Sequence, residues 1–132
     1  MVTFSQIAKG ARVYLHRRTK SPRLRGCPQK RATCIRVYTM SPKKPNSAVR
    51  KIAKVRLSTG QRTLVYLPGQ GHSLQQHSVI LIRGGRTPDC PGISYKAIRG
   101  KHDFTSRESF DRRTNRSKYG TPRPKKLFIL VI

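Results

Sequence analysis

Five short segments between residues 31 and 100 have strand-like patterns, and turn-forming residues separate them; most alternate between apolar and polar side chains, and "SVILIRGG" is nearly continuously apolar. In "RKIAKVRL", Ala53, Val55 and Leu57 fall on one face, and basic side chains fall on the other. A period of two is typical of a strand with one buried face. No stretch between these segments has the apolar spacing of a long helix. This part of the chain is therefore predicted to be all-β.

The other four segments are "RATCIRVYTM", "RTLVYLPG", "SVILIRGG" and "ISYKAIRG". Residues 50–67 predict a hairpin around the turn "STGQ". Five short strands favour a closed barrel of the OB-fold type, because the alternative, a two-sheet sandwich, usually needs more strands. In the first strand, Ala32, Cys34 and Arg36 alternate with Thr33, Ile35 and Val37. In the last, Ile93, Tyr95 and Ala97 lie opposite Ser94, Lys96 and Ile98.

The chain is strongly basic, with 30 Lys and Arg, 4 Asp and Glu, and a formal net charge of +26. Residues 1–88 contain no acidic residue. Such a chain repels itself unless a polyanion balances it. No amphipathic helix with a wide apolar face is visible, so a membrane partner is not expected. Because the basic residues are spread over strands and loops, a folded nucleic acid is the favoured partner.

Composition divides the chain into three parts. Residues 1–27 form a basic N-terminal extension, in which Ser5 is expected to cap a short helix. Residues 28–105 form the barrel. Residues 106–132 form a basic C-terminal tail that ends in "LFILVI", a segment expected to pack on a neighbouring protein. The N-terminal stretch has no apolar run typical of a signal peptide.

Reactive side chains are few and scattered. The four carboxylates are scattered along the sequence, whereas acid–base catalysis needs titratable groups that converge in a pocket. The sequence has no glycine-rich phosphate-binding motif. Cys27, Cys34 and Cys90 are odd in number and irregularly spaced, which favours free thiols over disulfides or a zinc site. The sequence therefore predicts no enzyme activity, no cofactor, no metal and no catalytic residue.

Residues 42–48, "PKKPNSA", predict a stiff and exposed basic loop. The two prolines restrict the backbone, so little entropy is lost when the loop binds a partner. The two lysines can hold phosphates, and Asn46 and Ser47 are short enough to approach a groove. An ordinary solvated turn would use the same residue types. The residues alone leave these two interpretations equally open.

The runs "GCPQKRATCIRVYTMSPKKPNSAVRKIAKVRL", "PGQGHSLQQHSVILIRGGR", "DCPG" and "NRSKYG" closely resemble the small-subunit ribosomal protein S-twelve family of bacteria and organelles. The resemblance extends from about residue 21 to residue 126. It implies an OB barrel whose N-terminal arm threads through small-subunit rRNA at the decoding centre. It further implies contact with neighbouring ribosomal proteins and a position on the face that meets the large subunit.

The resemblance also implies site residues. A decoding loop would lie beside the rRNA bases that inspect mRNA–tRNA pairing in the A site, with Pro45 and Ser47 supporting those bases, and a second loop would also influence accuracy and the response to streptomycin. The decoding loop is Lys43, Lys44, Pro45, Asn46 and Ser47, and the second decoding-centre loop includes Arg86, Pro88, Asp89, Pro91 and Gly92. The side chains expected to bind rRNA are Lys30, Arg31, Arg50, Lys51, Lys54, Arg56, Arg83, Arg116, Lys118 and Arg123.

The chain departs from the family pattern at three positions. Pro88 stands where the family usually has lysine, and Ser73 and Gln76 replace asparagine and glutamate. These departures and the "LFILVI" ending favour a mitochondrial ribosome, with a plastid or the bacterial cytoplasm as alternatives. The expected function is a structural constituent of the small subunit that supports accurate codon recognition. A stand-alone RNA-binding OB module or RNA chaperone is the alternative.

Overall fold

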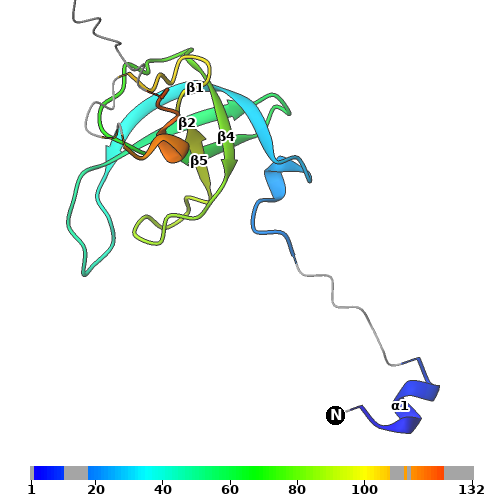
Figure 1. The fold of residues 1–132 in the computed structure, drawn as a ribbon. Coiled ribbons are helices and arrows are strands. Elements are labelled where there is room, and N and C mark those ends of the chain that lie inside the picture. Colours follow the sequence, from blue (N-terminus) through cyan, green and yellow to red (C-terminus); the bar gives the residue numbers. More distant parts are fainter. Residues whose placement is uncertain (1, 11–17, 108–111, 113, 124–132) are drawn as a thin grey trace, which may run out of the picture.

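The computed structural model describes residues 2–10, 18–107, 112 and 114–123. Five strands close into a barrel with the order β1-β2-β3-β5-β4 (Figure 1). This closed, all-β arrangement confirms the predicted OB-fold. The elements are α1 (Phe4–Ala8), the 3₁₀ helix η1 (Pro22–Leu24), β1 (Gln29–Met40), β2 (Arg50–Leu57), β3 (Arg62–Tyr66), β4 (Val79–Gly84), β5 (Tyr95–Ile98) and α2 (Arg116–Tyr119).

Strand pairing closes the barrel through its longest strand. β1 has 12 residues and pairs antiparallel with two strands: its first part, residues 29–33, pairs with β4, and residues 32–40 pair with β2. β2 and β3 form the predicted hairpin over residues 50–67. β5 pairs antiparallel with β4 and lies parallel to β3, where Lys96 faces Tyr66. The last pairing joins the two ends of the sheet.

A β-bulge in β1 reverses which residues face the core. Cys34 pairs with Val55, but Arg36 pairs with Lys54, so Ile35 has no partner on β2. Ala32 and Cys34 are buried before the bulge, and Val37 packs against the core after it. The simple alternation that groups Arg36 with Ala32 and Cys34 therefore breaks at the bulge, because the extra residue leaves Arg36 exposed.

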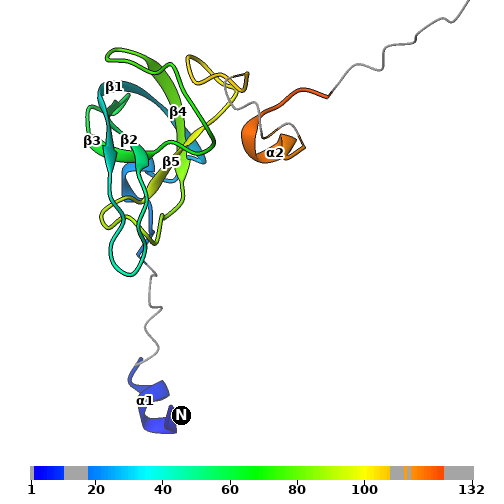
Figure 2. The ribbon, with the colours of Figure 1, turned by 90° about the vertical axis from the view of Figure 1, so that its left-hand side faces the viewer.

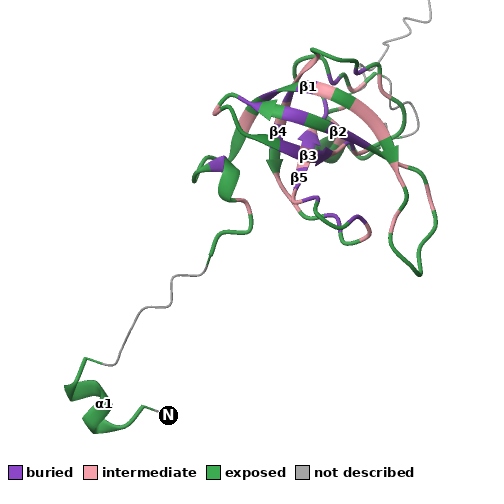
Figure 3. Ribbon diagram, turned by 180° about the vertical axis from the view of Figure 1, so that it is seen from behind, coloured by how far each residue is buried: buried purple, intermediate pink, exposed green. Residues whose placement is uncertain are grey.

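The main core fills the barrel with apolar side chains. The ribbon in Figure 3 is purple at the buried residues. The predicted inward residues of β2 are all buried, as are Ile93, Tyr95 and Ala97. Phe104 follows β5 and is fully buried. Additional core members are Leu24, Val65, Leu67, Leu74, Ile80 and Ile82.

A second apolar cluster lies on the other face of β2. Ile52 alternates with the core residue Ala53, yet both are fully buried. Cys90 and Ile93, from the segment between β4 and β5, cover Ile52. Tyr38, Met40, Leu64 and Tyr66 pack around them. This segment is thus held against the barrel by apolar packing.

The N-terminal extension is partly anchored. Leu24 is buried in the main core, and the Arg23 backbone N–H donates to the Tyr95 hydroxyl at 3.1 Å. Farther upstream, α1 begins after Thr3, whose N–H donates to Gln6 Oε1 at 3.0 Å. Ser5 lies within the helix, so the expected Ser5 cap is wrong.

A buried arginine holds the loop after β3. Arg99 is 3% exposed and donates to the carbonyl oxygens of Pro68, Gly71 and Thr105 at 2.7–3.1 Å. Its guanidinium lies 4.2 Å from the centroid of the Phe104 ring. Backbone dipoles therefore stabilise this charge inside the protein.

The predicted partner contact of "LFILVI" falls on residues outside the described part of the chain. Among the helices that the structure describes, none is long and apolar enough to cross a membrane.

Candidate nucleic-acid interface

Two loops leave the same end of the barrel (Figures 1 and 2). Residues 41–49 join β1 to β2, and residues 85–94 join β4 to β5. Strand register explains why they meet. Ile52, near the start of β2, pairs with Tyr66 at the end of β3, and Tyr66 pairs with Lys96 at the start of β5. The parallel β3–β5 pairing therefore brings the start of β5 close to the start of β2.

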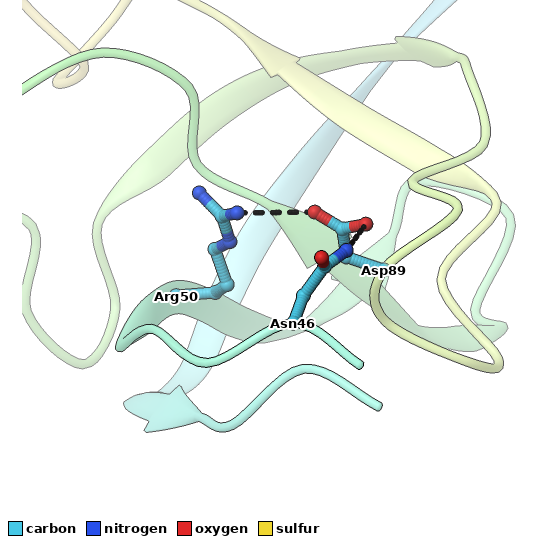
Figure 4. A network of polar contacts seen from close by, with 3 residues as sticks. All are labelled: Asn46, Arg50 and Asp89. Carbon is cyan, nitrogen blue, oxygen red and sulfur yellow. Dashed lines mark hydrogen bonds and ion pairs between the residues drawn. The ribbon is translucent and has the colours of Figure 1, made fainter. Parts of the chain in front are cut away.

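Asp89 ties the two loops together (Figure 4). Asn46 Nδ2 donates to one carboxylate oxygen at 2.8 Å, and Arg50 Nη2 donates to the other at 3.0 Å. The Lys43 backbone N–H donates to the Asp89 carbonyl at 2.9 Å. We call these three contacts the Asp89 clamp. Arg50–Asp89 is the one ion pair within the described part of the chain.

The second loop gives the clamp a firm base. Cys90 and Ile93 follow Asp89 in sequence and are each 1% exposed in the second apolar cluster. The Cys90 N–H donates to the Thr87 carbonyl, and the Thr87 N–H donates to the Ile93 carbonyl, both at 3.2 Å. Because this turn is closed and packed, Asp89 acts as a fixed acceptor for the first loop.

The clamp leaves most of the predicted loop residues facing solvent. Lys43, Lys44, Pro45 and Ser47 are exposed, and Asn46 is exposed while its amide bonds to Asp89. The Asn46 N–H also donates to the Lys43 carbonyl at 3.1 Å, which tightens the turn. In the second loop, Arg86, Pro88, Pro91 and Gly92 are exposed. The structure thus brings the two predicted loops together as one surface.

The basic residues predicted to bind rRNA do not form one patch. They lie on β1 (Lys30, Arg31), on β2 (Arg50, Lys51, Lys54, Arg56), on β4 (Arg83), and in or after α2 (Arg116, Lys118, Arg123). All are exposed except Lys30 and Arg50, which are half-buried. Arg50 differs from the rest because, among the residues that the structure describes, its guanidinium has a carboxylate partner.

Sheet register reveals basic residues that sequence reasoning missed. Three pairs of cations lie directly opposite one another on neighbouring strands: Arg36 with Lys54, Arg56 with Arg62, and Arg83 with Lys96. Like charges in this position destabilise a sheet. Knowledge of the bulge at Ile35 and of the β4–β5 register would have been needed to find these pairs.

Carboxylates in the described residues do not relieve this repulsion. Asp89 is occupied by the clamp, and Asp103 Oδ2 accepts the Val79 backbone N–H at 2.6 Å. Phosphates of a nucleic acid would neutralise the paired cations and release counterions. The outer face of the barrel therefore suits a polyanion better than it suits water alone.

The cysteines are free thiols of two kinds. Cys27 is exposed, whereas Cys34 and Cys90 are buried. Burial raises the pKa of Cys34 to about 11, and the nearby Asp103 carboxylate adds to the effect. A buried thiol with such a pKa is a poor nucleophile at neutral pH. In the described residues, no group of three or more His, Cys, Asp or Glu side chains is placed to hold a metal ion.

One family comparison covers most of the chain. The family described as Ribosomal protein S12/S23 matches residues 17–126, which include the whole barrel, both clamped loops and α2. Membership implies a structural role in the small ribosomal subunit and association with small-subunit rRNA and ribosomal proteins. The chain therefore belongs to the ribosomal protein S12/S23 family and is a structural component of the small subunit of the ribosome.

Proposed function

We propose that this chain supports accurate codon recognition at the decoding centre of the small subunit. The observation that carries the proposal is the Asp89 clamp. It joins two loops that come from distant parts of the sequence and leaves Lys43, Lys44, Pro45 and Ser47 exposed on one end of the barrel.

A clamped loop suits this role because recognition requires a fixed geometry. Ordering a flexible loop on binding costs entropy, and contacts formed in advance reduce that cost. In the proposal, the Lys43 and Lys44 ammonium groups hold rRNA phosphates. The Pro45 ring and the Ser47 hydroxyl support the rRNA bases that inspect the mRNA–tRNA pair in the A site. The protein contributes positioned groups and no bond-making chemistry, so it is not an enzyme.

The second loop contributes differently from its counterpart in the family. Pro88 is exposed and carries no charge, whereas the resemblance predicts lysine there. Arg86 is then the nearest cation of that loop available for an rRNA phosphate. We expect this loop to act mainly through the clamp, with a weaker direct hold on rRNA and an altered response to streptomycin.

The proposal is tested by the frequency of misreading. Lys43→Ala is introduced into the chain, and ribosomes carrying it translate a reporter that gains activity only through a near-cognate error. Lys101→Ala is the matched control, because Lys101 is an exposed lysine beyond the far end of β5. Error frequency should change for Lys43→Ala and stay constant for Lys101→Ala, at equal incorporation into subunits. Equal error frequencies in both variants would contradict the proposal.

The position of the chain in the subunit and the compartment of the ribosome are also part of the proposal. We place the chain on the subunit face toward the large subunit by its resemblance to the family. We place it in a mitochondrial ribosome because Ser73, Gln76 and Pro88 depart from the family pattern and because the chain ends in "LFILVI". By the same resemblance, the basic N-terminal extension, residues 1–27, would thread through small-subunit rRNA. Cell fractionation followed by sedimentation of mitochondrial subunits tests the compartment.

The opposed cations on the outer face would also suit a stand-alone RNA-binding protein or an RNA chaperone. The two functions differ in where the chain resides. A ribosomal constituent stays with small subunits when they are washed in high salt, whereas an exchanging RNA binder is released, because phosphate contacts weaken steeply with salt.

A further inference from the structure

A basic groove lies between the barrel wall and α2, beside the base of the second loop, and none of the decoding-loop residues 43–47 lines it. Its volume is about 530 Å³, a size typical of small-ligand sites. Tyr66, Arg83 and Lys96 line it from the barrel, and Lys118 and Tyr119 line it from α2. Sequence reasoning selected Arg83 and Lys118 but missed Lys96 and both tyrosines.

Strand register places the three barrel residues in one row. Lys96 pairs with Tyr66 on one side and with Arg83 on the other. The Arg83 and Lys96 side chains both pass close to Gly85. A Cβ at Gly85 would lie 3.2 Å from Arg83 Nη1 and 3.2 Å from Lys96 Cδ, so both side chains pass the same point.

Gly120 brings α2 against the barrel. Its φ is +64°, and a Cβ there would lie 2.6 Å from the Arg99 carbonyl oxygen. Glycine alone allows both this backbone conformation and this close approach. Figure 2 shows α2 outside the barrel wall. The contact sets Lys118 and Tyr119 at the rim of the groove.

The groove combines cations from three elements with aromatic rings, and no carboxylate is among the described residues that line it. Arg83 and Lys96 form one of the opposed cation pairs, so an anion between them would relieve their repulsion. The Arg112 guanidinium lies 5.7 Å from the centroid of the Tyr119 ring, on one face of it. A planar base is the natural partner for an aromatic ring beside a phosphate site.

We propose that this groove binds a single nucleotide of RNA, with its phosphate on Arg83, Lys96 and Lys118 and its base against Tyr119. The inference rests on the proposed function in so far as the RNA is small-subunit rRNA. It goes further by assigning a site that recognises both parts of a nucleotide, distinct from the decoding loops. On this basis α2 is a clasp that holds one splayed-out nucleotide against the barrel.

The test uses the full chain and three small probes at fixed ionic strength: AMP, adenosine and inorganic phosphate. Binding is followed by the amide NMR signals of Lys96, Lys118 and Tyr119. AMP should bind about tenfold more tightly than either fragment, because it makes both the charge-assisted and the stacking contacts. Equal affinity for AMP and phosphate would overturn the proposal, since it would mean that charge alone accounts for the binding.

Matched variants separate the groove from general basicity. Lys96→Ala with Lys118→Ala should weaken AMP binding about tenfold, since two charge-assisted contacts are lost. Lys51→Ala with Lys54→Ala removes the same charge from β2. This pair should change the affinity for AMP less than about twofold, since the groove stays intact. Equal weakening by both pairs would contradict the site. Tyr119→Leu should remove the preference for AMP over phosphate while phosphate binding persists.

Failure of this inference differs from failure of the proposed function. If AMP does not select the groove but Lys43→Ala alters misreading, the nucleotide site is wrong and the decoding role stands. If AMP selects the groove but Lys43→Ala leaves misreading unchanged, the site stands and the decoding role is wrong.

Discussion

Replacing Asp89 with asparagine changes one atom and should loosen the join between the two loops. The side-chain amide of Asp89→Asn keeps an oxygen that can accept the Asn46 amide, as Asp89 Oδ1 does at 2.8 Å. Its nitrogen then faces Arg50 Nη2, which lies 3.0 Å from Oδ2 in the native chain, so two donors confront each other. The backbone bond from the Lys43 N–H to the carbonyl of residue 89 remains possible in the variant.

The exposure of the pair sets the size of the effect. The Arg50 and Asp89 side chains are 35% and 31% exposed, so solvent screens part of their attraction. A surface pair contributes about 0.2–1 kcal/mol, and hydrogen bonds to charged groups contribute about 1.5–3 kcal/mol when well shielded. We therefore expect Asp89→Asn to cost about 1 kcal/mol, which is about a fivefold shift toward the open loop.

Hydrogen exchange of the Lys43 amide measures this opening directly, because its N–H donates to the Asp89 carbonyl. Exchange should quicken about fivefold in Asp89→Asn at low salt. A double-mutant cycle with Arg50→Gln should give a coupling energy of about 0.5–1 kcal/mol. In 1 M salt, where the Debye length is about 3 Å, the coupling should fall by half or more. No coupling at low salt, together with unchanged Lys43 exchange, would refute the clamp.

Three further predictions concern stability and reactivity. Gly120→Ala should destabilise the chain by about 2–3 kcal/mol in urea unfolding, because it combines a clash with left-handed strain, whereas Gly60→Ala, with positive φ but open space around it, should cost about 1 kcal/mol. Arg99→Met should lower the free energy of unfolding by about 3 kcal/mol, because the hydrogen bonds from a buried guanidinium to three backbone carbonyls are lost; a loss below about 1 kcal/mol would argue against that role. Cys27 should react with a thiol reagent at pH 8 while Cys34 reacts only after unfolding, and the contribution of the Cys34 thiol to stability, full below about pH 9, should be lost as the pH rises toward 11. Rapid labelling of native Cys34 at pH 8 would contradict the last point.

The barrel was largely predictable from local patterns. Ala53, Val55 and Leu57 alternate with charged residues, and that period requires a strand with one buried face. The turn "STGQ" joins two such strands, so the hairpin followed without tertiary information. The exposure of Arg36, by contrast, could not be predicted from the alternation of side chains. A bulge leaves no local signature here, and the single extra residue at Ile35 reverses every side chain that follows in β1.

The candidate site was predictable in part. The loop at 42–48 was identified by composition and by resemblance, but the clamp joins residues 43 positions apart, Asn46 and Asp89, and follows from how β3 and β5 pair. Arg50 looked like any other surface cation until the fold supplied its carboxylate. The groove under α2 depends on the contact of Gly120 with Arg99, which lie far apart in sequence. Long-range contacts of this kind cannot be derived from spacing alone.

The most direct test of the decoding role is what the loop tip touches in an assembled small subunit with mRNA and an A-site tRNA. A photoreactive p-benzoylphenylalanine is placed at Ser47, and in a control at Ser58, an exposed serine past the opposite end of β2. The length of β2 separates the two positions by roughly 25 Å. We predict crosslinks from position 47 to the rRNA bases beside the A-site codon and none from position 58 to those bases. Crosslinks from position 47 to rRNA remote from the codon, with subunits of normal composition, would contradict it.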